Sequence, residues 1–78
     1  TPSDDVVAQV TNAVLAIPEA RGVHAIKVRR AGGVTFVDLH VQADATMSLH
    51  EAHIVSGKAK GAIRAVLGQG TAVLVHME

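Results

Sequence analysis

The chain has 78 residues, 49% of them hydrophobic, so we expect one small domain spanning residues 1–78. Seven basic residues balance seven acidic ones and Phe36 is the only Phe, Tyr or Trp, which argues against nucleic acid as a partner. The lack of cysteine excludes disulfides and thiolate metal sites, and the longest apolar runs are far below the roughly 20 residues that span a bilayer.

The first predicted element is a helix over residues 4–17. Ser3 is the expected N-cap, and Asp4 and Asp5 lie where the helix dipole favours negative charge. Valine, alanine and isoleucine recur at helical spacing after them. Pro18 then ends the helix, because proline lacks an N–H group and restricts the residue before it.

Two strands joined by a tight turn follow the helix. The first strand covers residues 23–30, and the turn at 31–33 contains two glycines that accept positive φ angles. In the second strand, residues 34–44, the odd-numbered side chains are mostly apolar and are expected to face the core. The even-numbered side chains face away from it.

The second predicted helix starts at Ser48 and ends near Leu67. Ser48 and Glu51 fit a capping box, in which each satisfies the other's backbone N–H group. The expected buried stripe consists of Leu49, Ala52, Ile63, Val66 and Leu67. In a last strand over residues 71–77, Val73, Val75 and Met77 alternate with Leu74, His76 and Glu78.

This order of elements, α-β-β-α-β, predicts an α+β domain. The connection through the second helix makes the last strand parallel to another strand, so the sheet is three-stranded and mixed. Both helices are expected on one face of the sheet. The open face then carries Phe36, Asp38, His40, His76 and Glu78.

The outward residues predict a site for a divalent metal ion. Asp38 and His40 are two apart on one strand and His76 and Glu78 are two apart on another, so each pair leaves the same face. Imidazole and carboxylate are common metal ligands. A domain of this size often needs a metal ion or a second copy for stability. The alternative is that these residues are simply solvated.

The remaining histidines leave both a structural and a ligating role open. His50 and His53 are three apart on a helix, which is not the four-residue spacing of the zinc-protease motif. His24 lies alone on the first strand. No nucleophile elbow, phosphate-binding loop or dinucleotide motif is present, so we expect no enzyme activity.

Four strings occur in order along the chain: G-V-H-A-I-K-V-R-R-A-G-G at 22–33, F-V-D-L-H-V at 36–41, S-L-H-E-A-H at 48–53 and V-L-V-H-M-E at 73–78. Together they resemble the cytosolic C-terminal domain of cation diffusion facilitator transporters, including magnetosome-type members. The resemblance implies a ferredoxin-like, metallochaperone-like fold. It also implies a soluble domain on the cytoplasmic side of a membrane, following a membrane-spanning bundle and forming a homodimer.

The resemblance also implies a ligand set. In zinc-exporting members the matching positions are His24, His53, His76 and Glu78, and in magnetosome-type members Asp38 matches an acidic ligand. Our hypothesis is that these five residues bind a divalent transition metal ion, Zn²⁺, Fe²⁺ or Mn²⁺, between two copies. Binding would close the dimer and regulate the efflux transporter. The alternatives are a metal-independent structural dimerisation module and a domain that senses a small molecule.

Overall fold

The computed structural model describes every residue from Thr1 to Glu78. Two helices and three strands follow one another in the predicted α-β-β-α-β order. The elements are α1 (Pro2–Leu15), β1 (Gly22–Ala31), β2 (Val34–Gln42), α2 (Leu49–Leu67) and β3 (Ala72–Met77). Neither helix is both long enough and apolar enough to cross a bilayer.

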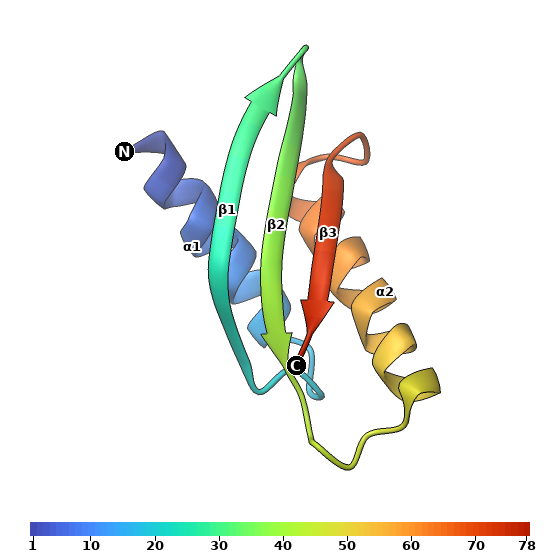
Figure 1. The fold of residues 1–78 in the computed structure, drawn as a ribbon. Coiled ribbons are helices and arrows are strands. Elements are labelled where there is room, and N and C mark those ends of the chain that lie inside the picture. Colours follow the sequence, from blue (N-terminus) through green and yellow to red (C-terminus); the bar gives the residue numbers. More distant parts are fainter.

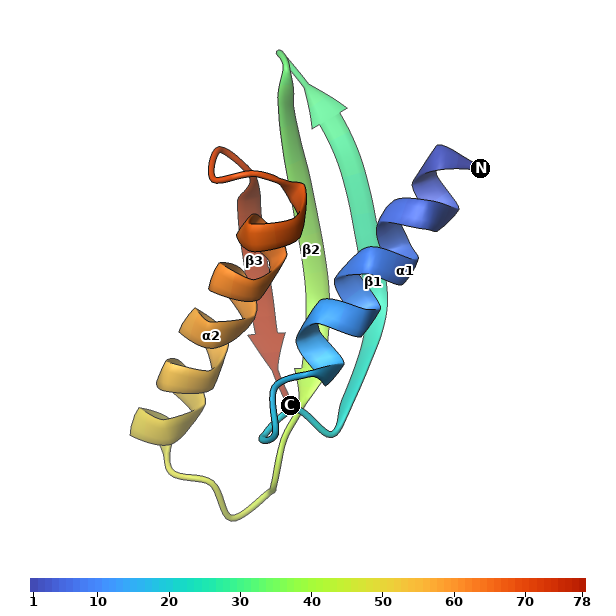
Figure 2. The same cartoon turned by 180° about the vertical axis from the view of Figure 1, so that it is seen from behind.

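The sheet is mixed, with strand order β1-β2-β3 and β2 in the centre. β1 pairs antiparallel with β2, and β3 pairs parallel with β2. Both helices cover the same face, as the front and back views show (Figures 1 and 2). Gly32 and Gly33, at φ angles of 58° and 79°, form the hairpin turn that the sequence predicts. The predicted architecture is confirmed.

The core lies between the sheet and the two helices. The odd-numbered face of β2 supplies its centre, since Val37, Leu39 and Val41 are at most 2% exposed. Helix α1 packs Val10 and Val14 onto them, and α2 adds its own apolar side chains. Because one face of β2 is buried so completely, the register of the sheet is fixed and the even-numbered side chains must point outward.

β1 contains an irregularity that the sequence pattern does not reveal. His24 pairs with His40 but Lys27 pairs with Asp38, so one residue of β2 faces two residues of β1. Ala25 takes a φ angle of 53°, which a non-glycine residue rarely adopts. This β-bulge turns His24 and Lys27 to the same face although they are three residues apart. It therefore leaves Ile26 free to pack against the core.

Helix α1 begins and ends earlier than predicted. Thr1, rather than Ser3, is the N-cap, and its hydroxyl accepts a hydrogen bond from the Asp4 N–H group. Pro2 follows directly, and proline is well suited to the first turn because its missing N–H has no helical partner there. The helix ends at Leu15 because Pro18 disfavours helical backbone in the residue before it.

The buried stripe of α2 was also predicted partly wrong. Val55, Ala59 and Ile63 are its buried residues, four apart along the helix. Leu49 is 88% exposed because it lies in the first turn of the helix, beyond the sheet. Val66 is 46% exposed because its side chain leaves the helix about 100° away from that of Leu67. Ser48 is the N-cap as predicted. The Glu51 carboxylate, however, accepts a hydrogen bond from the Ser48 hydroxyl and not from the Ser48 backbone N–H group.

Candidate metal centre

Three histidines form a row across the open face of the sheet. His24 pairs with His40 and His40 pairs with His76, so each strand contributes one imidazole at the same level. The rings stack, with centroids 5.5 Å apart for His24 and His40 and 4.6 Å apart for His40 and His76. The row follows from the strand spacing of about 4.8 Å, which brings paired side chains on one face into contact.

Glu78 joins two of these histidines at one atom. Its Oε1 accepts hydrogen bonds from Nε2 of His24 at 3.0 Å and from Nδ1 of His40 at 2.9 Å. The backbone of Glu78 is fixed as well, because its N–H donates to the Val41 carbonyl and its carbonyl accepts from Ala43. One ligand atom from each of His24, His40 and Glu78 lies within 4.8 Å of the other two.

Asp38 and His76 form a second pair beside the first group. Nε2 of His76 donates to Oδ1 of Asp38 at 2.9 Å. The two residues are diagonal neighbours, since Leu74 is the direct partner of Asp38 and His76 stands two residues further along β3. Both side chains are partly open to solvent. This pair offers two ligands on the open face, next to the three of the other group.

The electrostatics favour the charged form of Glu78. Partial burial acts to raise the pKa of its carboxyl group, but the hydrogen bonds from His40 and His24 together outweigh that effect. The pKa of Glu78 therefore lies below the ordinary value for glutamate. A carboxylate that stays ionised at neutral pH is the form that ligates a metal ion.

Two of the three ligand distances in the first group are close to those around a tetrahedral metal ion. Ligand atoms bound at 2.0–2.1 Å to such an ion are about 3.3 Å apart. The distances from Glu78 Oε1 to the two imidazole nitrogens are within a few tenths of an ångström of this value. Each imidazole could bind a divalent cation through the nitrogen that now faces the carboxylate, as the neutral tautomer with its proton on the other ring nitrogen. His24, His40 and Glu78 could then provide three ligands and leave a position open.

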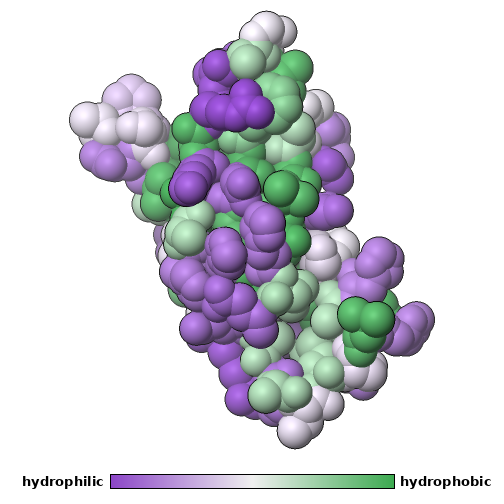
Figure 3. Space-filling view, in the orientation of Figure 1, coloured by the Kyte–Doolittle hydropathy of each residue, from purple (hydrophilic) through white to green (hydrophobic).

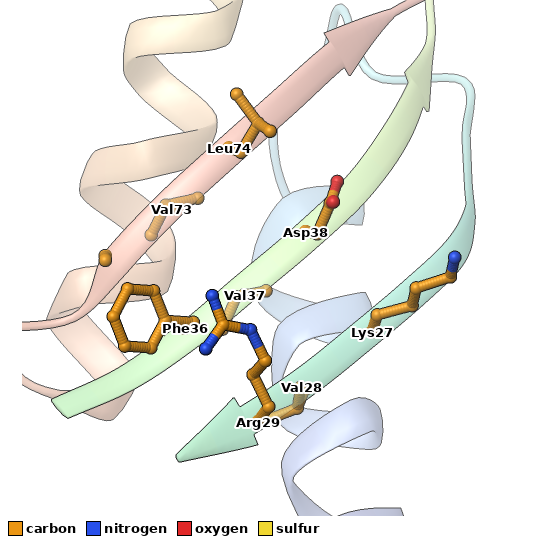
Figure 4. A pocket seen from close by; sticks show the side chains of 9 residues that line it. Lys27, Val28, Arg29, Phe36, Val37, Asp38, Val73 and Leu74 are labelled. Atoms are coloured by element: carbon orange, nitrogen blue, oxygen red, sulfur yellow. The ribbon is translucent and has the colours of Figure 1, made fainter. Parts of the chain in front are cut away.

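A groove of about 310 Å³ continues from Asp38 along the open face. Its lining combines apolar side chains, including Phe36, Val73 and Leu74, with Lys27 and Arg29 at the β1 side (Figure 4). Leu74 is 55% exposed. Hydrophilic side chains gather over the lower middle of this face and hydrophobic ones lie beside them higher up (Figure 3). The histidine and carboxylate side chains of this face therefore lie next to an apolar surface.

The residues predicted as ligands divide into three places. His24 and Glu78 lie together, and Asp38 lies with His76. His53 lies on α2 with its side chain exposed, and that side chain makes no hydrogen bond. His40 was predicted on the open face but was not in the ligand set that the resemblance implies, although it touches Glu78 and stacks on both neighbouring histidines. The strand register, which sequence spacing alone does not give, is the signal that would have identified it.

Comparison with known proteins agrees with the fold. The family model for the cytoplasmic domain of cation efflux proteins matches residues 2–78. The cation-efflux pump FieF of Pectobacterium atrosepticum is 33% identical over 61 residues, which is 78% of this chain and 20% of that protein. FieF of Yersinia pestis is 31% identical over 75 residues, 96% of this chain and 25% of that protein. The chain thus spans at most about a quarter of these relatives.

Solved structures of the MamM C-terminal domain share the fold. One has a TM-score of 0.89 at 20% identity, with 97% of this chain and 96% of that chain covered. A cadmium form of a MamM variant has a TM-score of 0.91 at 19% identity, covering 100% of this chain and 96% of the other. A nickel form of another variant has a TM-score of 0.88 at 19% identity, covering 96% and 95%. These likenesses confirm the predicted ferredoxin-like fold.

Proposed function

The chain belongs to the cation efflux protein family, whose cytoplasmic domain it matches over residues 2–78, and from this membership we propose that it senses divalent metal ions for an efflux transporter. Residues 1–78 would be the C-terminal regulatory domain on the cytoplasmic side of a membrane, and a membrane-spanning part of the same protein would carry the transported ion. The length of the FieF relatives, about four times that of this chain, supports such a part.

The observation that carries the proposal is the shared oxygen of Glu78. One carboxylate atom of the last residue, Glu78, lies about 3 Å from nitrogens of two imidazoles on β1 and β2. Such an arrangement favours the binding of a cation more than it favours folding, because exposed ion pairs of this kind add little to the stability of the fold. Imidazole suits Zn²⁺ and Fe²⁺, while carboxylate also suits Mn²⁺. Metal-bound forms of the MamM domain add support for a divalent ion.

A homodimer would complete the second group, the Asp38–His76 pair. Asp38 and His76 provide two ligands on an open face, and a twofold axis through that face would bring two such pairs together. Four ligands, two imidazoles and two carboxylates, would then surround one ion. The exposed Leu74 and the half-buried Phe36 next to them offer apolar surface for the contact. His53 would add a ligand only from another subunit or after a movement of α2.

Metal binding would act on the dimer through charge. Without an ion, the carboxylates of two facing copies repel one another and hold the subunits apart. A divalent cation offsets this repulsion and favours a closed arrangement, and a coupling of about 1–3 kcal/mol is enough to change an equilibrium five- to 150-fold. The attached membrane helices would follow the change in angle between subunits.

Small-angle scattering of the chain with and without Zn²⁺ tests the proposal. The Cα atoms of one protomer have a radius of gyration of 12.0 Å, and the molecular mass from the forward scattering shows whether the chain is a dimer in solution. Addition of Zn²⁺ should lower the radius of the dimer, and the Asp38→Ala variant should respond less. A dimer whose radius stays the same while calorimetry detects no heat of binding would refute metal sensing.

The second candidate is a metal-independent structural dimerisation module. It is favoured by one observation: each of the three stacked histidines already has a carboxylate partner and needs no ion to satisfy it. This candidate expects a dimer of constant radius whose stability is insensitive to Zn²⁺. The scattering and calorimetric measurements therefore separate the two candidates.

A further inference from the structure

Three arginines gather at the end of the molecule opposite the histidine row. Arg29 and Arg30 are exposed near the end of β1, where the chain enters the hairpin turn. Arg64 lies in the last turn of α2, which ends beside the same hairpin. We call these residues the tip cluster. Figure 1 shows the hairpin turn and the red loop after α2 at the same end of the fold.

The tip cluster has no carboxylate partner. Two of the four other Lys and Arg side chains are paired, Arg21 with Asp44 at 2.9 Å and Lys58 with Glu19 at 2.8 Å, whereas Lys27 and Lys60 are single charges outside the tip. No ion pair in the structure includes Arg29, Arg30 or Arg64. The cluster therefore keeps its positive charge available for an anion outside the domain.

Neutral contacts hold these arginines in place. Arg30 donates to the Thr35 hydroxyl at 2.9 Å and to the Gly33 carbonyl at 3.3 Å. Nε of Arg64 donates to the Thr71 carbonyl at 3.0 Å, and the guanidinium of Arg29 lies 4.1 Å from the centre of the Phe36 ring. Such fixed guanidinium groups lose less side-chain freedom when they bind phosphate than free ones do.

Apolar groups and a polar cleft lie among the arginines. Val34, the first residue after the turn, is 37% exposed. A cleft of about 280 Å³ separates the hairpin from the loop after α2, and Arg30, Thr35 and Thr71 are among its lining residues. Cationic groups with apolar side chains between them are typical of surfaces that lie on lipid headgroups.

The position of the N-terminus favours a membrane as the partner. The N-terminus lies toward the hairpin end in both views of the fold, away from Glu78 (Figures 1 and 2). The membrane part in the proposed function would precede Thr1, which would bring this end closest to the bilayer. Asp4 and Asp5 share the end, but they occupy the first turn of α1, where the helix dipole offsets part of their charge.

We propose that the tip cluster docks the domain on the anionic phospholipid headgroups of the membrane next to it. The inference relies on the proposed function only for the nearby membrane and needs no metal ion. Headgroup phosphates would contact Arg29, Arg30 and Arg64, and Val34 would lie at the level of the headgroups. The contact would hold the domain against the bilayer at the end opposite the metal centre.

Vesicle co-sedimentation of the 78-residue chain in EDTA tests the docking. The vesicles are phosphatidylcholine alone or equal parts of phosphatidylcholine and phosphatidylglycerol, at an ionic strength of about 0.1 M. We expect binding only to the anionic vesicles. The Arg29→Gln/Arg30→Gln variant should bind about 25-fold more weakly, since each arginine near such a surface strengthens association about fivefold. Far-UV circular dichroism checks that both chains are folded.

Arg21→Gln is the matched control, because it removes the same kind of charge at the other end of the molecule. It should leave vesicle binding within about twofold of the unchanged chain, since a distant charge is screened. Equal binding to neutral vesicles, no binding to either kind, an equal loss in Arg21→Gln, or displacement by millimolar inorganic phosphate would overturn the docking. The presence of EDTA separates this result from failure of metal sensing.

Discussion

His40 is the residue whose replacement tests the metal centre most directly. The His40→Ala variant removes the nitrogen that lies 2.9 Å from Glu78 Oε1 and leaves two of the three ligands of that group. Loss of an outer-sphere partner alone weakens metal binding by about 10- to 100-fold. Loss of a ligand should therefore weaken Zn²⁺ binding at least about 100-fold, or roughly 2.7 kcal/mol. Isothermal titration calorimetry at neutral pH measures this difference.

His50→Ala is the control for that experiment. His50 is an exposed histidine on α2 that makes no side-chain hydrogen bond, so its removal should change the Zn²⁺ affinity very little. The double variant His24→Ala/His40→Ala should lose less than the sum of the single losses, because both nitrogens serve one ion. Equal weakening in His40→Ala and His50→Ala, or additive losses, would refute a shared site at Glu78.

The core, the hairpin turn and Glu78 each give a further measurable expectation. Leu39 is fully buried, so Leu39→Ala should lower the free energy of unfolding in urea by about 2–5 kcal/mol, whereas Leu74→Ala on the open face should change it by about 0.5 kcal/mol or less; similar losses would contradict the described core. Gly33 has a φ angle of 79° with open space around it, so Gly33→Ala should lower the unfolding free energy by about 1 kcal/mol through backbone strain alone, and Gly33→Asn should lower it less in thermal denaturation. Because the folded pKa of Glu78 is below its ordinary value of 4.5, its contribution to stability is present above that pH and is lost as the pH falls through the folded pKa. Glu78→Gln should therefore flatten the acid side of the stability profile, and an unchanged slope below pH 4.5 would count against these hydrogen bonds.

Much of the fold could be predicted because the second strand has an unambiguous pattern. Val37, Leu39 and Val41 alternate with polar residues, which fixes both the core face and the open face. Helix ends were harder, since Thr1 and Ser3 are both good N-caps and only Pro2 favours the earlier one. The prediction of the buried stripe of α2 failed because alanine and glycine interrupt the apolar pattern. Two different faces of the helix then have similar numbers of apolar residues.

The candidate site could be predicted only in part, because its contacts depend on register. The two-residue spacings of Asp38 with His40 and of His76 with Glu78 correctly indicated one face. They did not indicate that Glu78 lies against His24 and His40 while Asp38 lies against His76. That division follows from which residues of β2 and β3 stand opposite each other, and side-chain spacing within one strand contains no such information.

The bulge in β1 has a consequence for reading related sequences. Regular alternation would put His24 on the side of Ile26 and Val28, which pack toward the helices, yet His24 stands on the open side because of the extra residue at Ala25. A relative without that residue would carry the equivalent histidine two positions before the lysine instead of three. A sequence alignment can therefore lack the histidine in this column although the related protein has one on the open face of its sheet. Only the alternation of inward and outward side chains along the strand distinguishes the two cases.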